Sequence, residues 1–201
     1  TSTGIFTPHN YNRRFHGPMR LRLALANSLN VSAVKVLKQY SGPRELQSLL
    51  QKCGLNTLEK NEKHYGLGLT LGNAEARLVE LANAYACLAR LGQHRPLRLR
   101  RSDPSHQRQL FNSTAAWWVA DILSDNNARA RSFGLHSSLE FNFPVACKTG
   151  TSSDFRDNWA FGYTPKYTVG IWVGNFDGSP MREVSGVTGA APIMQDLMEF
   201  L

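Results

Sequence analysis

The chain has 201 residues, of which 42% are hydrophobic and 19% are charged. This composition excludes an intrinsically disordered chain, and the length allows one domain or one domain with a small lobe. The formal net charge of +8 favours acidic partners, and the basic residues gather near Arg13, Arg14, Arg20 and Arg22 and again between residues 95 and 101.

Helical periodicity dominates the first 125 residues. Apolar spacing predicts helices over 19–28, 30–40, 43–54, 74–92 and 114–124. Pro43 suits the first turn of its helix, Asn73 is a candidate N-cap for 74–92, and Asn112 or Ser113 is one for 114–124. Residues 96–101 alternate and predict a short strand.

The pattern becomes strand-like after residue 140. Short runs rich in aromatic and β-branched residues cover 143–150, 158–164 and 167–176, and an amphipathic helix is expected over 191–201. The loops between the strands are short enough for antiparallel neighbours. The order indicates an α+β layered domain, with a helical lobe at about 18–125 and a sheet with a final helix at about 140–201.

Several classes of site and segment are not indicated. Cys53, Cys87 and Cys147 are odd in number and form no C-x-x-C pair, so neither a disulfide framework nor a zinc site is expected, and we predict no cofactor. The chain contains no apolar run of about 18 residues, and residues 1–15 do not resemble a signal peptide.

The stretch Lys148-Thr149-Gly150-Thr151 carries the clearest chemistry. A lysine at the end of a strand presents a cation, the two threonine hydroxyls can bind a carboxylate, and Gly150 lets another backbone lie against the strand. The Thr151 N–H can face a developing oxyanion. Strict alternation places Lys148 and Thr149 on opposite faces, so an edge strand blunted by lysine, with a bulge at the glycine, is the alternative.

A second candidate is Ser28-Leu29-Asn30. Residues two apart do not share a helix face, so both polar side chains serve one site only if they lie in a turn between helices. Serine and asparagine are also typical of ordinary turns and caps.

Together these two motifs resemble the second and third active-site motifs of penicillin-binding proteins and serine β-lactamases. The flanks, "LGLTLGNAEARLVELANAYACLARLG" and "KTGTSSDFRDNWAFGYTPKYTVGIWVGNFDG", resemble the transpeptidase domain of class A, bifunctional penicillin-binding proteins. The resemblance implies that fold and a peptidoglycan D,D-transpeptidase that cross-links D-Ala-D-Ala stem peptides through a serine acyl-enzyme and binds β-lactam antibiotics. It also implies a membrane-anchored parent protein at the periplasmic face of the bacterial cytoplasmic membrane.

The same resemblance assigns roles to the residues. Ser28 relays protons toward the leaving group, Asn30 binds the substrate amide, and Lys148 orients the relay and attracts the substrate carboxylate. Thr149 and Thr151 hold that carboxylate, and the Thr151 N–H forms half of the oxyanion hole.

The family's S-x-x-K motif, which supplies the nucleophile, has no match upstream of Ser28. Ser32 and Lys35 have the same spacing, but the apolar side of their helix indicates that Lys35 faces water, where it keeps its charge. We therefore interpret this pair as a decoy and the chain as a fragment that begins after the nucleophile, inactive by itself.

Three alternatives remain open at this stage. The chain is a non-catalytic basic module that binds an anionic polymer, a degenerate enzyme that uses Ser32 and Lys35, or part of a β-lactamase. A role with nucleic acid is not favoured, because no stacking aromatic motif or DNA-reading helix is apparent.

Overall fold

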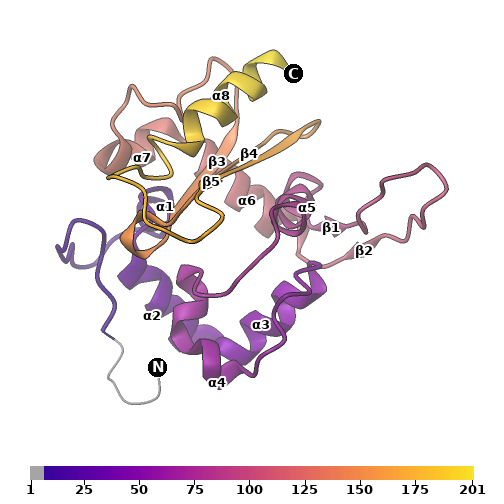
Figure 1. Cartoon of the computed structure of the whole chain (residues 1–201), viewed down its shortest axis with the longest axis horizontal. Coiled ribbons are helices and arrows are strands. Elements are labelled where there is room, and N and C mark those ends of the chain that lie inside the picture. Colours follow the sequence, from indigo (N-terminus) through magenta and orange to yellow (C-terminus); the bar gives the residue numbers. More distant parts are fainter. Residues whose placement is uncertain (1–6) are drawn as a thin grey trace.

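The computed structural model describes residues 7–201. Helices cover both faces of an antiparallel sheet, and a further group of helices lies to one side of it (Figure 1). The expected α+β fold is confirmed.

The sheet has three strands in the order β3 (Ala146–Thr151), β4 (Asp157–Tyr163) and β5 (Thr168–Gly174). Lys148 of β3 pairs with Phe161 of β4, and Trp159 of β4 pairs with Trp172 of β5. Aromatic residues therefore take part in the pairing of the central strand with each of its two neighbours. A short 3₁₀ turn, η2 (Ser153–Phe155), joins β3 to β4. The predicted strands are therefore present, with ends shifted by a few residues.

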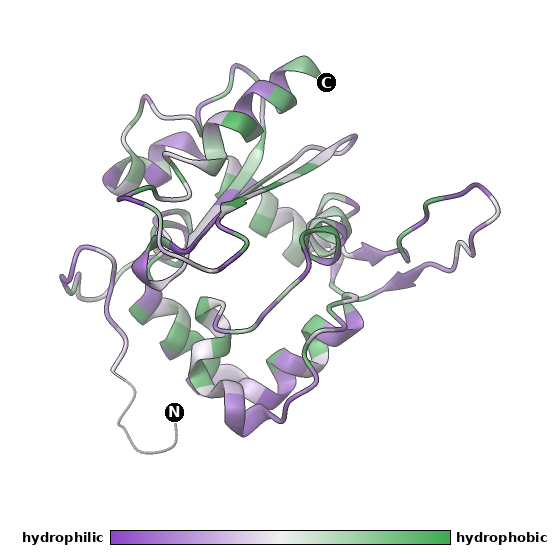
Figure 2. Ribbon diagram, viewed as in Figure 1, coloured by the Kyte–Doolittle hydropathy of each residue, from purple (hydrophilic) through white to green (hydrophobic). Residues whose placement is uncertain are grey.

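One face of the sheet is covered by α8 (Ala190–Phe200). Its buried side contributes Met194 and Met198, which pack with Cys147 and Ala160 from the strands. In Figure 2 the hydrophobic residues of α8 are green and its polar residues purple, as expected for an amphipathic helix on a sheet.

The opposite face is covered by α5 (Leu78–Ala89) and α6 (Ser113–Ser124). Tyr85 of α5 stacks on Phe161 of β4, with their ring centroids 4.4 Å apart. Asn112 caps α6 as predicted, because its Oδ1 accepts hydrogen bonds from the N–H groups of Thr114 and Ala115. The predicted Asn73 cap is wrong: α5 begins only at Leu78, and the Asn73 amide donates to the Tyr65 carbonyl instead.

The remaining helices lie beside the sheet. They are α1 (Leu21–Ala26), α2 (Asn30–Tyr40), α3 (Pro43–Lys52), α4 (Glu62–Tyr65) and the 3₁₀ helix η1 (Gly66–Leu71). A second core of Cys53, Leu55, Leu58, Tyr65 and Leu69 lies between α3, α4 and η1, whereas Ala26 of α1 packs with Ile122 of α6 and Ala128 of α7 (Asn126–Phe133). The sequence patterns did not predict α4, η1 or α7, because these elements are short and weakly periodic.

A two-stranded arm projects from the body between α5 and α6 (Figure 1). Only β1 (Gln93–His94) and β2 (Arg108–Gln109) pair, so the predicted strand at 96–101 is wrong. The physical reason is Asp103, whose Oδ2 accepts hydrogen bonds from the N–H groups of Leu99 and Arg100 at 2.8 Å each. These backbone donors are therefore turned toward a side chain rather than a neighbouring strand.

The structure also bears on the expectations about membrane spans, metals and thiols. No helix within residues 7–201 is long and apolar enough to cross a bilayer. Within the same range, no cluster of three or more His, Cys, Asp and Glu side chains is arranged to hold a metal ion. Cys53, Cys87 and Cys147 are buried free thiols.

Candidate functional site

The two predicted motifs meet at a single contact. Lys148 Nζ donates a hydrogen bond of 2.6 Å to Ser28 Oγ and another of 2.6 Å to the Thr149 carbonyl. Ser28 lies in the turn between α1 and α2, as its sequence context predicts, and has a φ of +54°. A serine with positive φ is uncommon and marks a turn that its surroundings must hold in place.

Burial sets the electrostatics of this contact. It lowers the pKa of the Lys148 ammonium to about 8 from its ordinary value of 10.5. None of the ion pairs within residues 7–201 includes Lys148, so no carboxylate offsets the loss of hydration. A lysine with a pKa near neutral pH can both hold and release a proton, and its hydrogen-bonded hydroxyl partner can pass that proton on.

Asn27 fixes the turn that carries Ser28. Its Nδ2 donates to the carbonyls of Leu23, at 2.9 Å, and Ala128, at 2.7 Å, and its Oδ1 accepts from the Ser132 N–H at 2.9 Å. The Ser132 hydroxyl donates to the Asn27 carbonyl at 3.2 Å. Asn27 is buried, so these bonds join the end of α1 to α7 across about a hundred residues of sequence.

Ion pairs formed by Arg22, in the preceding part of α1, hold the same helix in place as the hydrogen bonds of Asn27 do. The Arg22 guanidinium bonds to the carboxylates of Asp121 and Asp125, and Asp125 also caps α7 through Ala128 N–H. The helix before Ser28 is thus held against both α6 and α7.

Asn30 lies beside the contact but is not joined to it. It is the first residue of α2, and its Nδ2 donates to the His9 carbonyl at 2.9 Å. Within residues 7–201 no hydrogen bond connects Asn30 to Ser28 or Lys148. The buried Asn10 side chain accepts from Val31 N–H at 3.1 Å, so the segment before Pro18 covers the start of α2.

The threonines follow Lys148 along β3. Thr149 and Gly150 are half-buried and Thr151 is exposed. The Thr151 Oγ1 accepts a hydrogen bond of 2.9 Å from Gly186 N–H, which belongs to the segment before α8. A Cβ at Gly186 would lie 2.5 Å from the Gly150 carbonyl oxygen, so only a glycine lets this segment approach the strand so closely.

Ser32 and Lys35 lie on α2, and within residues 7–201 neither forms a hydrogen bond with Ser28 or Lys148. Val34 and Leu37 are the buried residues of that helix, and Lys35 is exposed. Within the described part of the chain, no hydrogen bond links Ser32 to Lys35. The interpretation of this pair as a decoy stays a prediction.

We did not predict roles for Asn27, Asn10 or Gly186 from the sequence. Asn27 adjoins Ser28 at the end of an apolar helix, where an asparagine is expected as an ordinary C-terminal cap, and only the packing of α7 shows its other partners. Gly186 is one of several glycines in a loop, and no local pattern separates it from the others.

Comparison with known proteins identifies the family to which this chain belongs. The family described as "Penicillin binding protein transpeptidase domain" matches residues 1–199. The chain belongs to the penicillin-binding protein transpeptidase family. The predicted resemblance to this family is therefore confirmed.

Similarity to curated relatives covers nearly the whole chain. It is 38% identical over 199 residues to penicillin-binding protein 1C of Escherichia coli strain K12, covering 99% of this chain and 25% of that protein. It is 30% identical to penicillin-binding protein 1A of Clostridium acetobutylicum, and this match covers 98% of this chain and 25% of that protein. Within this match, the stretches "KTGTSSDFRDNWAFG" at 148–162 and "GAAPI" at 189–193 are the ones that most resemble protein 1C. The chain spans about a quarter of the length of these relatives.

Solved structures support the fold. The chain superimposes on penicillin-binding protein 1A from Haemophilus influenzae with a TM-score of 0.76 and 19% identity, covering 98% of this chain and 37% of that one. It superimposes on penicillin-binding protein A from M. tuberculosis, solved as an imipenem acyl-enzyme complex, with a TM-score of 0.72, 19% identity, and 94% and 50% covered.

Proposed function

We propose that this chain is the part of a peptidoglycan D,D-transpeptidase that binds the carboxylate end of the donor stem peptide and relays protons. The observation that carries the proposal is the 2.6 Å bond between Lys148 Nζ and Ser28 Oγ, with the pKa of that lysine lowered to about 8. This pair can deliver a proton to a departing amine and recover one from an incoming amine.

The nucleophile belongs to a longer parent protein in this proposal. The parent carries an S-x-x-K serine that attacks the penultimate carbonyl of the donor, and the terminal D-Ala leaves. The carboxylate of that terminal residue is held by Lys148, Thr149 and Thr151. Gly150 lies against the peptide backbone. Asn30 binds the substrate amide when the donor peptide is bound beside Ser28. The parent is anchored in the bacterial cytoplasmic membrane and faces the periplasm.

Labelling with a fluorescent penicillin tests the proposal. We expect covalent labelling of the full-length parent at its S-x-x-K serine and no labelling of residues 1–201 alone, because a β-lactam mimics the donor peptide and needs the nucleophile. Mass spectrometry locates the adduct. A full-length protein that stays unlabelled contradicts the assignment, and an adduct on Ser32 shows that Ser32 and Lys35 are the true catalytic pair.

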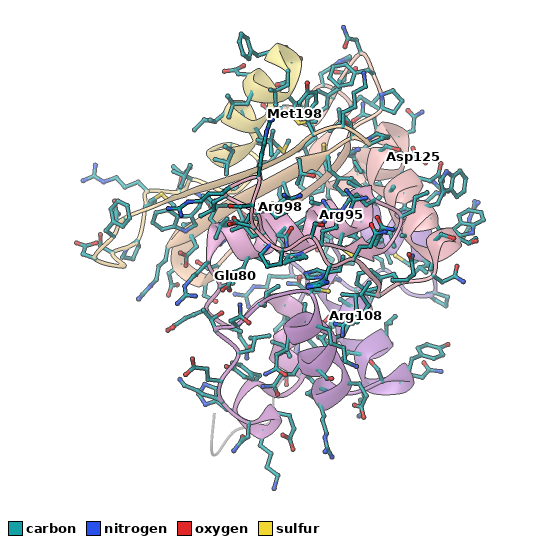
Figure 3. All side chains as sticks on the ribbon, turned by 90° about the vertical axis from the view of Figure 1, so that its right-hand side faces the viewer. Glu80, Arg95, Arg98, Arg108, Asp125 and Met198 are labelled. Carbon is teal, nitrogen blue, oxygen red and sulfur yellow. The ribbon has the colours of Figure 1, made fainter. Side chains whose placement is uncertain are left out.

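A second candidate function rests on the basic arm. Arg98, Arg100 and Arg101 are exposed near its tip, where Asp103 is the acidic residue beside them. Figure 3 shows Arg95 and Arg98 on the side of the molecule from which the arm projects. Such a concentration of exposed cations suits an anionic polymer, whose counterions are released on binding.

Salt dependence tests this second function. With inorganic polyphosphate as the probe, we expect log affinity to fall linearly with log salt concentration. Replacing Arg98, Arg100 and Arg101 with glutamine should reduce that slope by about two to three. Replacing Arg44, Lys63 and Lys166, exposed cations on other surfaces, is the control. An equal slope in the arm variant contradicts polymer binding by the arm.

A further inference from the structure

A pocket of about 430 Å³ lies between helix α5 and the two-stranded arm. This volume is within the range of sites that hold a small molecule. Figure 3 faces this side of the molecule and labels two of the lining arginines, Arg95 and Arg98. No Asp or Glu side chain of the described chain lines the pocket. Its polar and basic lining residues are Asn83, Arg90, Arg95, Arg98, Ser105 and Gln107.

Arg90 is the residue of this pocket that points to a ligand. It follows the last turn of α5, and its Nε donates a hydrogen bond of 3.1 Å to the Gln93 carbonyl. Its Nη2 is buried and has no hydrogen-bond partner, and within residues 7–201 its Nη1 has no acceptor either. A buried donor without an acceptor is destabilising, and a bound ion is one of the few explanations for such a group in a native protein.

The positive charge of the pocket has no acidic partner in the described chain. None of the ion pairs within residues 7–201 includes Arg90, Arg95 or Arg98. Asp103, the acidic residue of the arm, accepts hydrogen bonds from backbone N–H groups at the tip instead. Burial and the nearby charge of Arg95 lower the pKa of the Arg90 guanidinium below its ordinary value of 12.5. An anion bound here offsets the repulsion between these two cations.

Hydrogen bonds hold two of the arginines side by side. Gln93 accepts from Arg90 through its carbonyl, and its Oε1 accepts from Arg95 Nε at 3.2 Å and from Arg95 Nη2 at 2.8 Å. Asn83 Nδ2 of α5 donates to the Arg95 carbonyl at 3.0 Å, so the base of the arm is fixed against the helix. The two guanidinium groups are therefore positioned before any ligand arrives, which lowers the entropic cost of binding.

The donors of the pocket suit a phosphate group. A guanidinium binds phosphate through two parallel N–H bonds, because its planar fork matches the spacing of the anion's oxygens. The Ser105 hydroxyl and the Gln107 amide are exposed, line the same pocket and form no hydrogen bond within residues 7–201. A phosphate ester presents three terminal oxygens as acceptors, so it can use more of these donors than a carboxylate can.

We propose that the pocket between α5 and the arm binds the phosphate group of a phosphate ester, with Arg90, Arg95 and Arg98 as the binding residues. The site shares no residue with the contact between Ser28 and Lys148. It therefore goes beyond the proposed transpeptidase function and does not depend on it. It also differs from polymer binding at the arm tip, because it requires the guanidinium at the end of α5.

Equilibrium dialysis of the full-length parent with radiolabelled glycerol phosphate at low salt tests the site. Other parts of the parent can also bind the probe, so the measured quantity is the difference between wild type and variant. We expect Arg90→Gln to weaken binding by about ten- to a hundredfold, because a charge-assisted donor is lost from a partly buried position. Arg98→Gln, at an exposed position, should weaken binding by about two- to fivefold.

Arg101→Gln is the matched control, because it removes one positive charge from the arm outside the pocket. It should bind the probe as the wild type does. Arg90→Lys keeps the charge without the planar fork, so its affinity should lie between those of wild type and Arg90→Gln. Wild-type affinity in folded Arg90→Gln overturns the site. Where Arg90→Gln does not fold, wild-type affinity in Arg98→Gln overturns it, as does equal weakening in Arg98→Gln and Arg101→Gln.

Competition separates two sources of the phosphate group. Dihexanoyl phosphatidylglycerol presents the group as part of a lipid headgroup, whereas unlabelled glycerol phosphate presents it as a soluble ester. Stronger displacement of the label by the lipid supports a headgroup as the ligand of the pocket, and stronger displacement by glycerol phosphate supports a soluble ester. A label that neither compound displaces contradicts a saturable phosphate site.

Discussion

Replacing Lys148 with methionine is expected to stabilise the folded chain near neutral pH while it removes the proposed activity. The folded state binds the Lys148 proton more weakly than the unfolded state does, because the pKa is about 8 in the fold and 10.5 ordinarily. Below pH 8 the folded state therefore holds a partly buried cation, which lowers the free energy of unfolding. Methionine keeps the length and packing of the side chain without that cation.

The size of the stability gain follows from linkage. A shift of this size corresponds to about 3 kcal/mol, and the variant loses the donor to Ser28 Oγ and to the Thr149 carbonyl. We expect a net gain in the free energy of unfolding on the order of 2 kcal/mol at pH 7. Urea unfolding of wild type and Lys148→Met measures this difference.

The gain has a defined pH dependence. Between pH 8 and 10.5 the unfolded state binds more protons at Lys148 than the folded state, so the wild type gains stability from this group as pH rises. The difference in the free energy of unfolding between Lys148→Met and the wild type should therefore shrink as the pH rises from 8 to 10.5. Buried thiols such as Cys87, with a pKa raised to about 11, act in the opposite direction in both proteins, so only the difference is diagnostic.

The functional loss should be larger. Removing the lysine that shares a proton with Ser28 is expected to slow acylation of the full-length parent by penicillin by a factor of about 100 to 10,000. Lys35→Met is the matched control, because Lys35 is exposed on α2 and should leave acylation at the wild-type rate. Equal acylation rates in Lys148→Met and wild type contradict the proposed role of Lys148.

Asn27→Leu is expected to give the second large effect. Leucine has a similar volume but leaves the Ala128 carbonyl and the Ser132 N–H without their buried partner. We expect a loss of about 2–4 kcal/mol in the free energy of unfolding. Asn127→Leu, on an exposed position of α7, should change stability far less.

A second readout separates positioning from stability alone. With the turn released, Ser28 no longer encloses Lys148, so the pKa of Lys148 should rise from about 8 toward 10.5 in the folded variant. Titration of the ¹³Cε resonance of Lys148 by NMR measures this shift, with Asn127→Leu as the reference. An unchanged titration midpoint in folded Asn27→Leu shows that Asn27 supports the fold without controlling the site.

Local patterns were sufficient to predict much of the framework. The helix over 43–52 with Pro43 in its first turn, the Asn112 cap of α6 and the three strands follow from propensity, capping and alternation, which act over a few neighbouring residues. The arm residues 96–101 and the start of α5 were predicted wrongly, because Asp103 and the Tyr65 carbonyl, several residues away, take over the relevant hydrogen bonds.

The sequence by itself determined which chemical groups are present: a lysine followed by threonines and a glycine on a strand, a serine and an asparagine in a turn, and the family to which their flanks belong. Only the tertiary structure decided that Ser28 and Lys148 touch, because 120 residues separate them and the contact depends on how α1 packs on α7. The low pKa of Lys148 has the same origin, because burial by distant parts of the chain causes it. Hydration and enclosure are properties of the packed chain, and no local sequence pattern encodes them.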